Sequence, residues 1–151
     1  MIPDDDNVVR YLRPSQVDQG IVDAGGFLRA GEDEPSVNWL EAFSGPIATQ
    51  LDNVRRVARI KYAANGHLVQ LPVGKTRDFV RRNDPEGKEI SFRSDPLPAT
   101  ELHPEDPSHA LIVGIPDHRS AEAALVRDLL AKCVVQVHPA KPPSAAPMPK
   151  T

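Results

Sequence analysis

The sequence predicts a single small α+β domain, and three observations lead to that fold class. The chain has 151 residues, which is enough for one domain with a core of its own. Its apolar content of 40% and its charged content of 26% are ordinary for a globular protein. Short β-branched runs and helical patterns follow one another without regular alternation, which favours α+β over α/β. We therefore expect residues 1–138 to form one globular domain around a mixed or antiparallel sheet of about five short strands.

Five short runs have the composition of strands, with β-branched residues or alternating polar and apolar positions. They lie at 8–12, 67–73, 88–93, 110–115 and 134–138. The run at 110–115 is the most apolar, so we expect it to be the central strand of the sheet. Pro72 lacks the amide that an interior strand position uses, so it suggests that the run at 67–73 lies at a sheet edge or ends there.

Two main helices are expected, at about 46–62 and 121–132. Pro46 suits the first turn of the earlier helix, because a proline there loses no hydrogen bond. The later helix follows Ser120, a residue type that caps helix N-termini. In both segments apolar residues recur at helical spacing, which predicts one buried stripe on each helix.

A shorter helix is expected at 36–43, where Ser36 is a possible N-terminal cap. Trp39 and Phe43 are four residues apart and would share one face of that helix. This aromatic pair is either a core anchor or an exposed site for a protein partner.

Residues 139–151 are predicted to form a disordered tail, because five of these thirteen residues are proline and most others are alanine, serine or lysine. Cys133 is the single cysteine, so no disulfide within the chain is possible. We also find no secretory signal in the acidic start of the sequence, and these two observations favour the cytoplasm. No apolar run approaches the roughly 20 residues that cross a bilayer, so no membrane association is expected.

Charge is distributed unevenly along the chain. Residues 1–54 carry ten acidic and three basic residues, whereas residues 55–82 carry one acidic and eight basic residues. The basic segment is a candidate surface for nucleic acid or another polyanion, and it could equally pair with the acidic N-terminal third inside the fold. The candidate contacts are Arg55, Arg56, Arg59, Lys75, Arg77, Arg81 and Arg82.

The segment 103–109 collects the side chains that are best suited to catalysis. In a small hydrolase or transferase, His109 would be the acid or base, with Asp106 or Glu105 assisting and Ser108 as a possible nucleophile. Ser108 lacks the flanking glycines of a nucleophile elbow, and Asp106 and Ser108 also suit ordinary turn hydrogen bonds. His109 could likewise bond a backbone carbonyl at a strand edge.

A metal site formed by His103, Asp106 and His109 is a weaker hypothesis, because their spacing matches no zinc motif. We predict no cofactor. Cys133 lies on the apolar stripe of its helix, where a thiol is expected to be inert. A loose set of residues that could cleave a nicotinamide dinucleotide consists of Arg10, Tyr11, Arg13, Ser36 and Glu41.

Gly74-Lys75-Thr76 copies the end of a phosphate-binding P-loop. The full motif needs a glycine five positions before Gly74, and Val69 stands there inside a predicted strand. We therefore reject a P-loop and expect Thr76 to cap a short helix at 77–82.

No motif is complete, and this favours a small accessory protein that binds a protein partner through a loop surface. The two alternatives are an enzyme that uses the segment 103–109 and a nucleic-acid binder that uses the basic segment 55–82.

Overall fold

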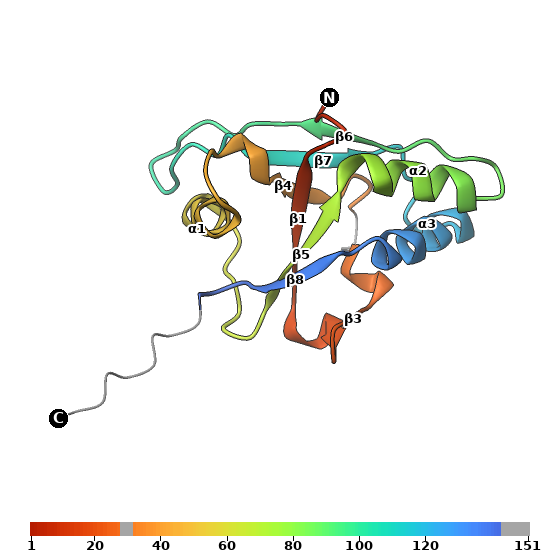
Figure 1. Cartoon of the computed structure of the whole chain (residues 1–151), viewed down its shortest axis with the longest axis horizontal. Helices are drawn as coiled ribbons and strands as arrows, with labels where there is room; N and C mark the ends of the chain where they lie inside the picture. Colours follow the sequence, from red (N-terminus) through yellow and green to blue (C-terminus); the bar gives the residue numbers. More distant parts are fainter. Residues whose placement is uncertain (28–31, 143–151) are drawn as a thin grey trace.

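A six-stranded antiparallel sheet organises the molecule in a computed structural model that describes residues 1–27 and 32–142 (Figure 1). The strand order is β6-β7-β4-β1-β5-β8, and every neighbouring pair is antiparallel. Its strands are β1 (Asn7–Leu12), β4 (Ser36–Trp39), β5 (His67–Pro72), β6 (Ser91–Ser94), β7 (His109–Val113) and β8 (Gln136–Pro139). A separate two-stranded sheet pairs β2 (Val17–Asp18) with β3 (Ile21–Val22). The predicted α+β class is confirmed.

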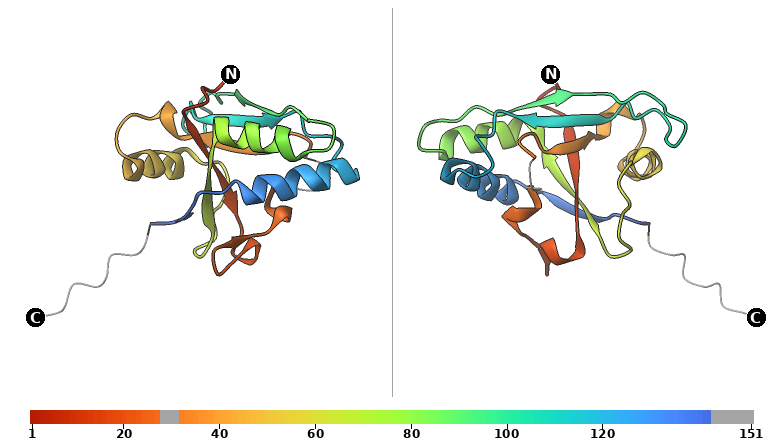
Figure 2. Two further views of the ribbon diagram at one scale, coloured as in Figure 1. Left: turned by 45° about the vertical axis from the view of Figure 1, so that its right-hand side comes forward. Right: turned by 180° about the vertical axis from the view of Figure 1, so that it is seen from behind.

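Helices cover both faces of the main sheet, with α1 (Ile47–Val57) on one face and α2 (Val73–Asn83) and α3 (Ala121–Lys132) on the other (Figures 1 and 2). Side chains alternate along β1 because successive residues of a strand point to opposite faces. Val8 packs with the residues of α2 and α3, whereas Val9 packs with those of α1. Burial on both faces accounts for the two consecutive valines of this central strand.

The helix predicted at 121–132 is confirmed, and the Ser120 Oγ accepts a hydrogen bond of 3.1 Å from the Ala123 amide. The helix predicted at about 46–62 begins near the expected position but ends at Val57. Basic residues in its last turn suit the negative end of the helix dipole. Beyond the helix, Tyr62 stacks on Tyr11 with the ring centroids 4.6 Å apart.

The segment 36–43 is not a helix, so that prediction was wrong. It forms β4 and then a 3₁₀ turn, Leu40–Ala42, because Ser36, Val37 and Asn38 pair with β7. Sheet pairing here overrides a capping signal that is local to the sequence.

One expectation about position needs correction. The strand formed by residues 110–113 lies second from an edge, in β7, and β1 and β4 occupy the middle of the sheet. The strand with Pro72 is interior, between β1 and β8, and it ends at Pro72, which is one of the two predicted alternatives. Proline is tolerated there because the pairing of β8 reaches only as far as Gln70.

A third helix of 11 residues, α2, replaces the short helix expected at 77–82. Thr76 is buried within it rather than capping it. The first two amides of α2 donate hydrogen bonds to backbone carbonyls of the N-terminal segment. The Val73 amide donates to Asp6 O and the Gly74 amide donates to Asp4 O, both at 2.9 Å. The helix therefore starts earlier than a side-chain cap would indicate.

Both edges of the sheet are partly closed. The Ile2 amide donates to Phe92 O of β6 at 3.0 Å, and the Arg55 guanidinium donates to Pro139 O of β8 at 2.8 Å. Ala140 is fully buried, so the folded part extends past residue 138, the expected boundary. Residues 143–151, which hold most of the predicted tail, lie outside the described residues.

Candidate functional site

The loop between β6 and β7 is ordered as an irregular hairpin, although it contains four prolines. Leu97 and Asp106 exchange two backbone hydrogen bonds of 2.9 Å across it. Nearer the tip, the Thr100 amide donates to His103 O at 2.8 Å. We call residues 95–108 the β6–β7 loop.

Leu102 stands at the tip of the β6–β7 loop and is 87% exposed, more than any other large hydrophobic residue that the structure describes. The Thr100 Oγ1 fixes the tip by accepting from the Leu102 amide at 3.3 Å and from the His103 amide at 3.1 Å. Glu101 and Glu105 are exposed on either side. The tip thus holds an aliphatic side chain in water between two carboxylates.

Arg59 ties the β6–β7 loop to the α1 side of the molecule. It lies two residues past the end of α1, and its Nη2 donates to both Pro98 O and Pro104 O. One guanidinium therefore bridges the two arms of the loop just below the tip. In Figure 1 the loop extends beside α1, far from α2 and α3.

The base of the loop is held by a buried polar network of Asn38, Asp106 and Ser108. Asp106 Oδ1 accepts from the Ser108 Oγ at 2.6 Å and from the Ser108 amide at 2.9 Å. The Asn38 amide group donates to Ser108 Oγ at 2.9 Å and to Asp106 Oδ2 at 3.3 Å. Asp106 and Ser108 are at most 2% exposed, so these two predicted catalytic groups serve as partners for each other.

His109 lies beside this network on β7, opposite Asn38. Its Nδ1 is 2.9 Å from Asp95 O and 3.2 Å from Asp95 Oδ2. The ring is 19% exposed, and it lines none of the four cavities found around α2, α3 and β8. Ser108 and His109 are neighbours in the chain, but their side chains have separate hydrogen-bond partners, Asp106 and Asp95.

Among the described residues, one group of three side chains has the geometry to hold a metal ion, and it is not the predicted one. Asp33, Asp117 and His118 offer ligand atoms within 4.8 Å of one another. The His118 Nδ1 already contacts Asp33 Oδ1 at 2.9 Å, and Arg119 binds Asp117. These contacts lower the pKa of both carboxyl groups: the hydrogen bond from His118 acts on Asp33, and those from Arg119 act on Asp117.

The basic segment 55–82 does not form one surface. Arg55, Arg56 and Arg59 belong to α1 and the chain just beyond it, whereas the other four cations lie on α2, on the opposite face of the sheet. Arg55 and Arg59 are engaged by backbone carbonyls. The segment therefore offers two smaller basic clusters.

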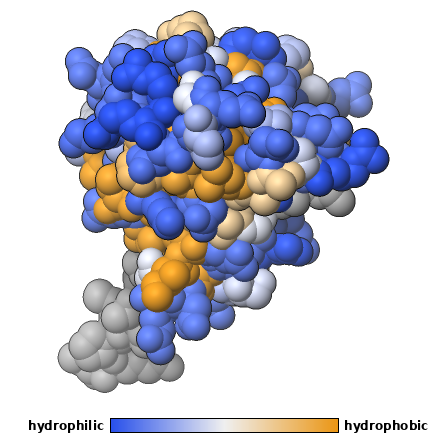
Figure 3. Space-filling view, turned by 90° about the vertical axis from the view of Figure 1, so that its right-hand side faces the viewer, coloured by the Kyte–Doolittle hydropathy of each residue, from blue (hydrophilic) through white to orange (hydrophobic). Residues whose placement is uncertain are grey.

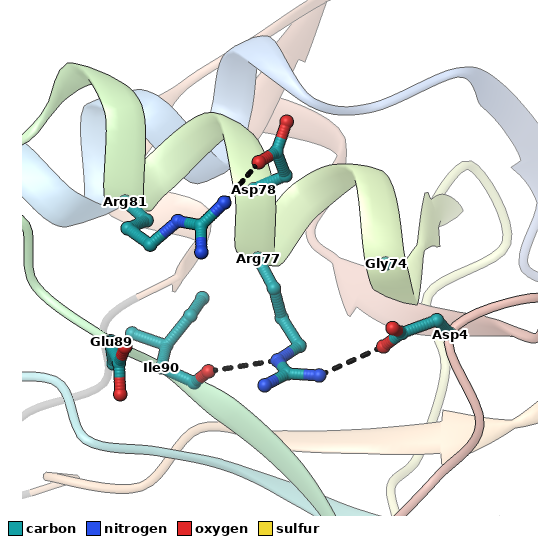
Figure 4. Close-up of a pocket in the computed structure, with 7 residues that line it drawn as sticks. All are labelled: Asp4, Gly74, Arg77, Asp78, Arg81, Glu89 and Ile90. Carbon is teal, nitrogen blue, oxygen red and sulfur yellow. Dashed lines mark hydrogen bonds and ion pairs between the residues drawn. The ribbon is translucent and has the colours of Figure 1, made fainter.

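The cations of α2 are themselves partly neutralised (Figure 4). Arg77 spans from Asp4 Oδ1 at 2.8 Å to Ile90 O at 3.2 Å, and Arg81 binds Asp78 at 2.7 Å. The cavity of about 220 Å³ at this place is lined by two arginines and three acids, a balance that does not favour an anion.

Gly74 serves close packing here rather than phosphate binding. A Cβ atom at Gly74 would approach Asp4 O to 2.9 Å, and the N-terminal amides of α2 already have carbonyl acceptors. The rejection of a P-loop agrees with this geometry.

Trp39 and Phe43 do not share a face, because their segment is a strand followed by a turn. Trp39 packs with the α2 and α3 side of the sheet and donates its Nε1–H to Asp6 at 2.9 Å. Phe43 packs with the α1 cluster. Both are half-buried, so the structure places these candidate partner-binding residues within the two cores.

Two residues of the dinucleotide hypothesis, Arg10 and Ser36, are in contact, and Glu41 has a partner outside the set. Arg10 is 2% exposed and donates to Gly26 O, Ser36 O and the Glu32 carboxylate at 2.8 to 2.9 Å. Glu41 instead accepts from the Asn7 amide at 2.6 Å. Arg10 thus joins the β2–β3 region to the sheet.

No protein-family model, curated protein or solved structure matches this chain. None of the helices in the described part of the chain is long and apolar enough to cross a membrane.

Leu102 is the functional candidate that sequence reasoning missed, and Arg59 was named there with a different role. Leu102 is an aliphatic residue between Glu101 and His103 in a segment that is otherwise polar, and that contrast was the available signal. Arg59 was assigned to the basic segment, and its role depends on a contact 39 residues away along the chain.

Proposed function

We propose that this protein is a small interaction protein that binds a protein partner through the β6–β7 loop, with Leu102 as the anchor. The single observation that carries the proposal is that a well-braced loop holds Leu102 in water. Burying a leucine side chain in a partner stabilises a complex by about 1.5–3 kcal/mol. A few well-buried side chains carry most of the binding free energy of many interfaces.

The bracing supports the proposal because it removes an entropic cost of binding. A flexible loop would lose conformational freedom when a partner captures its tip. Here Arg59, the paired amides of Leu97 and Asp106, and the Thr100 hydroxyl already fix the tip. The loop is therefore preorganised for docking.

The surroundings of His109 give less support to the enzyme alternative. The Ser108 hydroxyl is fully buried and bonded to Asp106, and the His109 Nδ1 faces Asp95. The division of the basic residues between two sheet faces likewise weakens the nucleic-acid alternative. A cytoplasmic location remains a prediction from the single cysteine.

The proposal predicts that Leu102→Asp abolishes partner capture. Tagged full-length chain would be expressed in its native cells, and co-purifying proteins would be quantified for the wild type and the variant. A loss of at least about tenfold is expected for partners held by the loop, because the anchor is removed and a charge is added.

The matched control is Ile47→Asp, which changes an exposed aliphatic residue in the same way at the start of α1. An aspartate is favourable at a helix N-terminus, so this variant should fold well and retain the partner. Equal capture by Leu102→Asp and Ile47→Asp would contradict the proposal.

A further inference from the structure

A second exposed apolar surface lies on the far side of the molecule from the β6–β7 loop. Two adjoining cavities, of about 480 and 390 Å³, share Lys132 and Val135 in their linings. Ile21 is 75% exposed and Val135 is 59% exposed. We call this surface the α3–β8 groove, and its apolar lining comprises Ile21, Val22, Phe79, Val134, Val135 and Val137.

Figure 3 views the molecule from this side and shows a band of apolar surface running down between hydrophilic regions. Exposed apolar patches that are rimmed by polar residues are typical of interaction sites. The patch is formed by β3, the end of α3 and the chain leading into β8, together with Phe79 of α2.

The α3–β8 groove carries one more cation than acid. Lys75, Arg82 and Lys132 line its two cavities, together with Asp78 and Asp128. Asp78 binds both Arg81 and Arg82, and Asp128 binds Lys132 at 3.2 Å. Lys75 makes no ion pair with any residue that the structure describes. This lysine leaves the groove with a positive charge, which favours an occupant that carries carboxylates beside an apolar side chain.

The tip of the β6–β7 loop has this chemistry, with Leu102 between Glu101 and Glu105. The loop lies on the α1 side of the sheet, and the groove lies on the side of α2 and α3 (Figures 1 and 2). A chain therefore cannot place its own loop in its own groove. A second copy can.

We propose that the α3–β8 groove receives the β6–β7 loop of a second copy of this chain, with Leu102 against Val135 and the two glutamates towards Lys75. This inference rests on the proposed function, because it takes the loop as the docking element. It adds the identity of the partner and the surface that the loop meets.

The contact joins two different surfaces, so copies associate head to tail rather than about a shared twofold axis. Each copy keeps a free loop at one end and a free groove at the other. A loop tip covers a small area, which makes the association weak. Its ionic part should weaken with salt.

Sedimentation equilibrium of the full chain tests the inference. Between about 10 µM and about 1 mM at low salt, the weight-average mass should rise above the 16.5 kDa of one chain, as expected for a small interface. Leu102→Asp and Val135→Asp should each stay at the mass of one chain. Ile47→Asp, which alters neither surface, should associate like the wild type.

Mixing the two single variants gives the sharper result. Leu102→Asp retains its groove and Val135→Asp retains its loop, so one productive contact remains between them. An equimolar mixture should form a species of two chains and grow no further. Circular dichroism would confirm folding, and Ile21→Asp replaces Val135→Asp if the latter does not fold.

A charge reversal tests the ionic part of the same contact. Lys75→Glu should weaken self-association, and mixing it with a Glu101→Lys, Glu105→Lys double variant should restore binding between the two chains. The wild type staying at one chain over the whole range would overturn the inference. So would a mixture of Leu102→Asp and Val135→Asp that stays monomeric while the wild type associates.

The inference and the proposed function fail differently. If the chain remains monomeric but loses a captured protein in the Leu102→Asp variant, the loop is a docking element and its partner is another protein. If self-association persists in Leu102→Asp, the loop is not the contact between copies and the inference is overturned, whereas the proposed function is overturned by equal partner capture in Leu102→Asp and Ile47→Asp.

Discussion

The residues of the β6–β7 loop and its surroundings have two roles. Some hold the loop in place, and others are exposed to solvent at its tip. Asp106 and Ser108 are buried and bond to each other and to the half-buried Asn38, whereas the Leu102 side chain is exposed to solvent. The sequence identified Asp106 and Ser108 as unusual residues, because polar groups cluster before an apolar strand. It could not show that their hydrogen bonds point inward, since that depends on Asn38, which is 68 residues from Asp106 in the chain.

Replacing Asp106 should therefore destabilise the fold rather than impair a reaction. Asp106→Ala leaves the Ser108 amide and hydroxyl without their buried acceptor, which costs about 2–4 kcal/mol in the free energy of unfolding. Urea denaturation measures this loss. The exposed neighbour Glu105→Ala is the control and should change stability by less than about 0.5 kcal/mol. Equal effects of the two variants would show that the network is not structural.

Cys133 should behave as an inert thiol. Burial raises its pKa to about 11, and the thiolate is the reactive form. Alkylation by iodoacetamide should be slow at pH 7 and should accelerate up to about pH 11. Because an unfolded cysteine titrates near about 8.5, the same shift removes stability as the pH rises above that value. Rapid alkylation of the folded protein at neutral pH would contradict the burial described here.

Among the helices, the prediction was most accurate where the sequence held both an N-terminal capping residue and a clear stripe of apolar residues. The helix from Ala121 to Lys132 had Ser120 before it and a clear apolar period, and its bounds were correct. The helix expected after Ser36 had a cap but too short a pattern, and pairing with β7 made that segment a strand. The start of α2 was missed because its cap comes from the backbone of Asp4 and Asp6.

The β6–β7 loop depends on Arg59, and that dependence is testable. Arg59→Ala removes the hydrogen bonds to Pro98 O and Pro104 O, so the two arms should separate more often. Hydrogen exchange at the Leu97 and Asp106 amides should become faster, while exchange in α3 stays unchanged. Arg56→Ala is the control, because Arg56 is exposed and bonds only the neighbouring Asn53 among the described residues. No difference between the variants would show that the loop is ordered without Arg59.

In the whole molecule, the sheet separates basic residues that are close together in the sequence. The basic segment 55–82 runs from α1 across β5 to α2, and so its cations finish on both faces. Charge counts along a chain do not show this separation, because it follows from where β5 pairs. The same topology puts the acidic, apolar tip of the β6–β7 loop on one side and the basic, apolar α3–β8 groove on the other. Composition indicated the charges, and only the fold assigned them to opposite sides.

Both proposals require that the tip of the β6–β7 loop contacts another polypeptide. Photocrosslinking tests this contact, with Leu102 replaced by a photoreactive benzoylphenylalanine in the full chain and the chain irradiated in its native cells. We expect a covalent product containing a second polypeptide, and no such product when the probe stands at exposed Asn65. Equal crosslinking at the two positions, or none at position 102, would show that the tip makes no such contact.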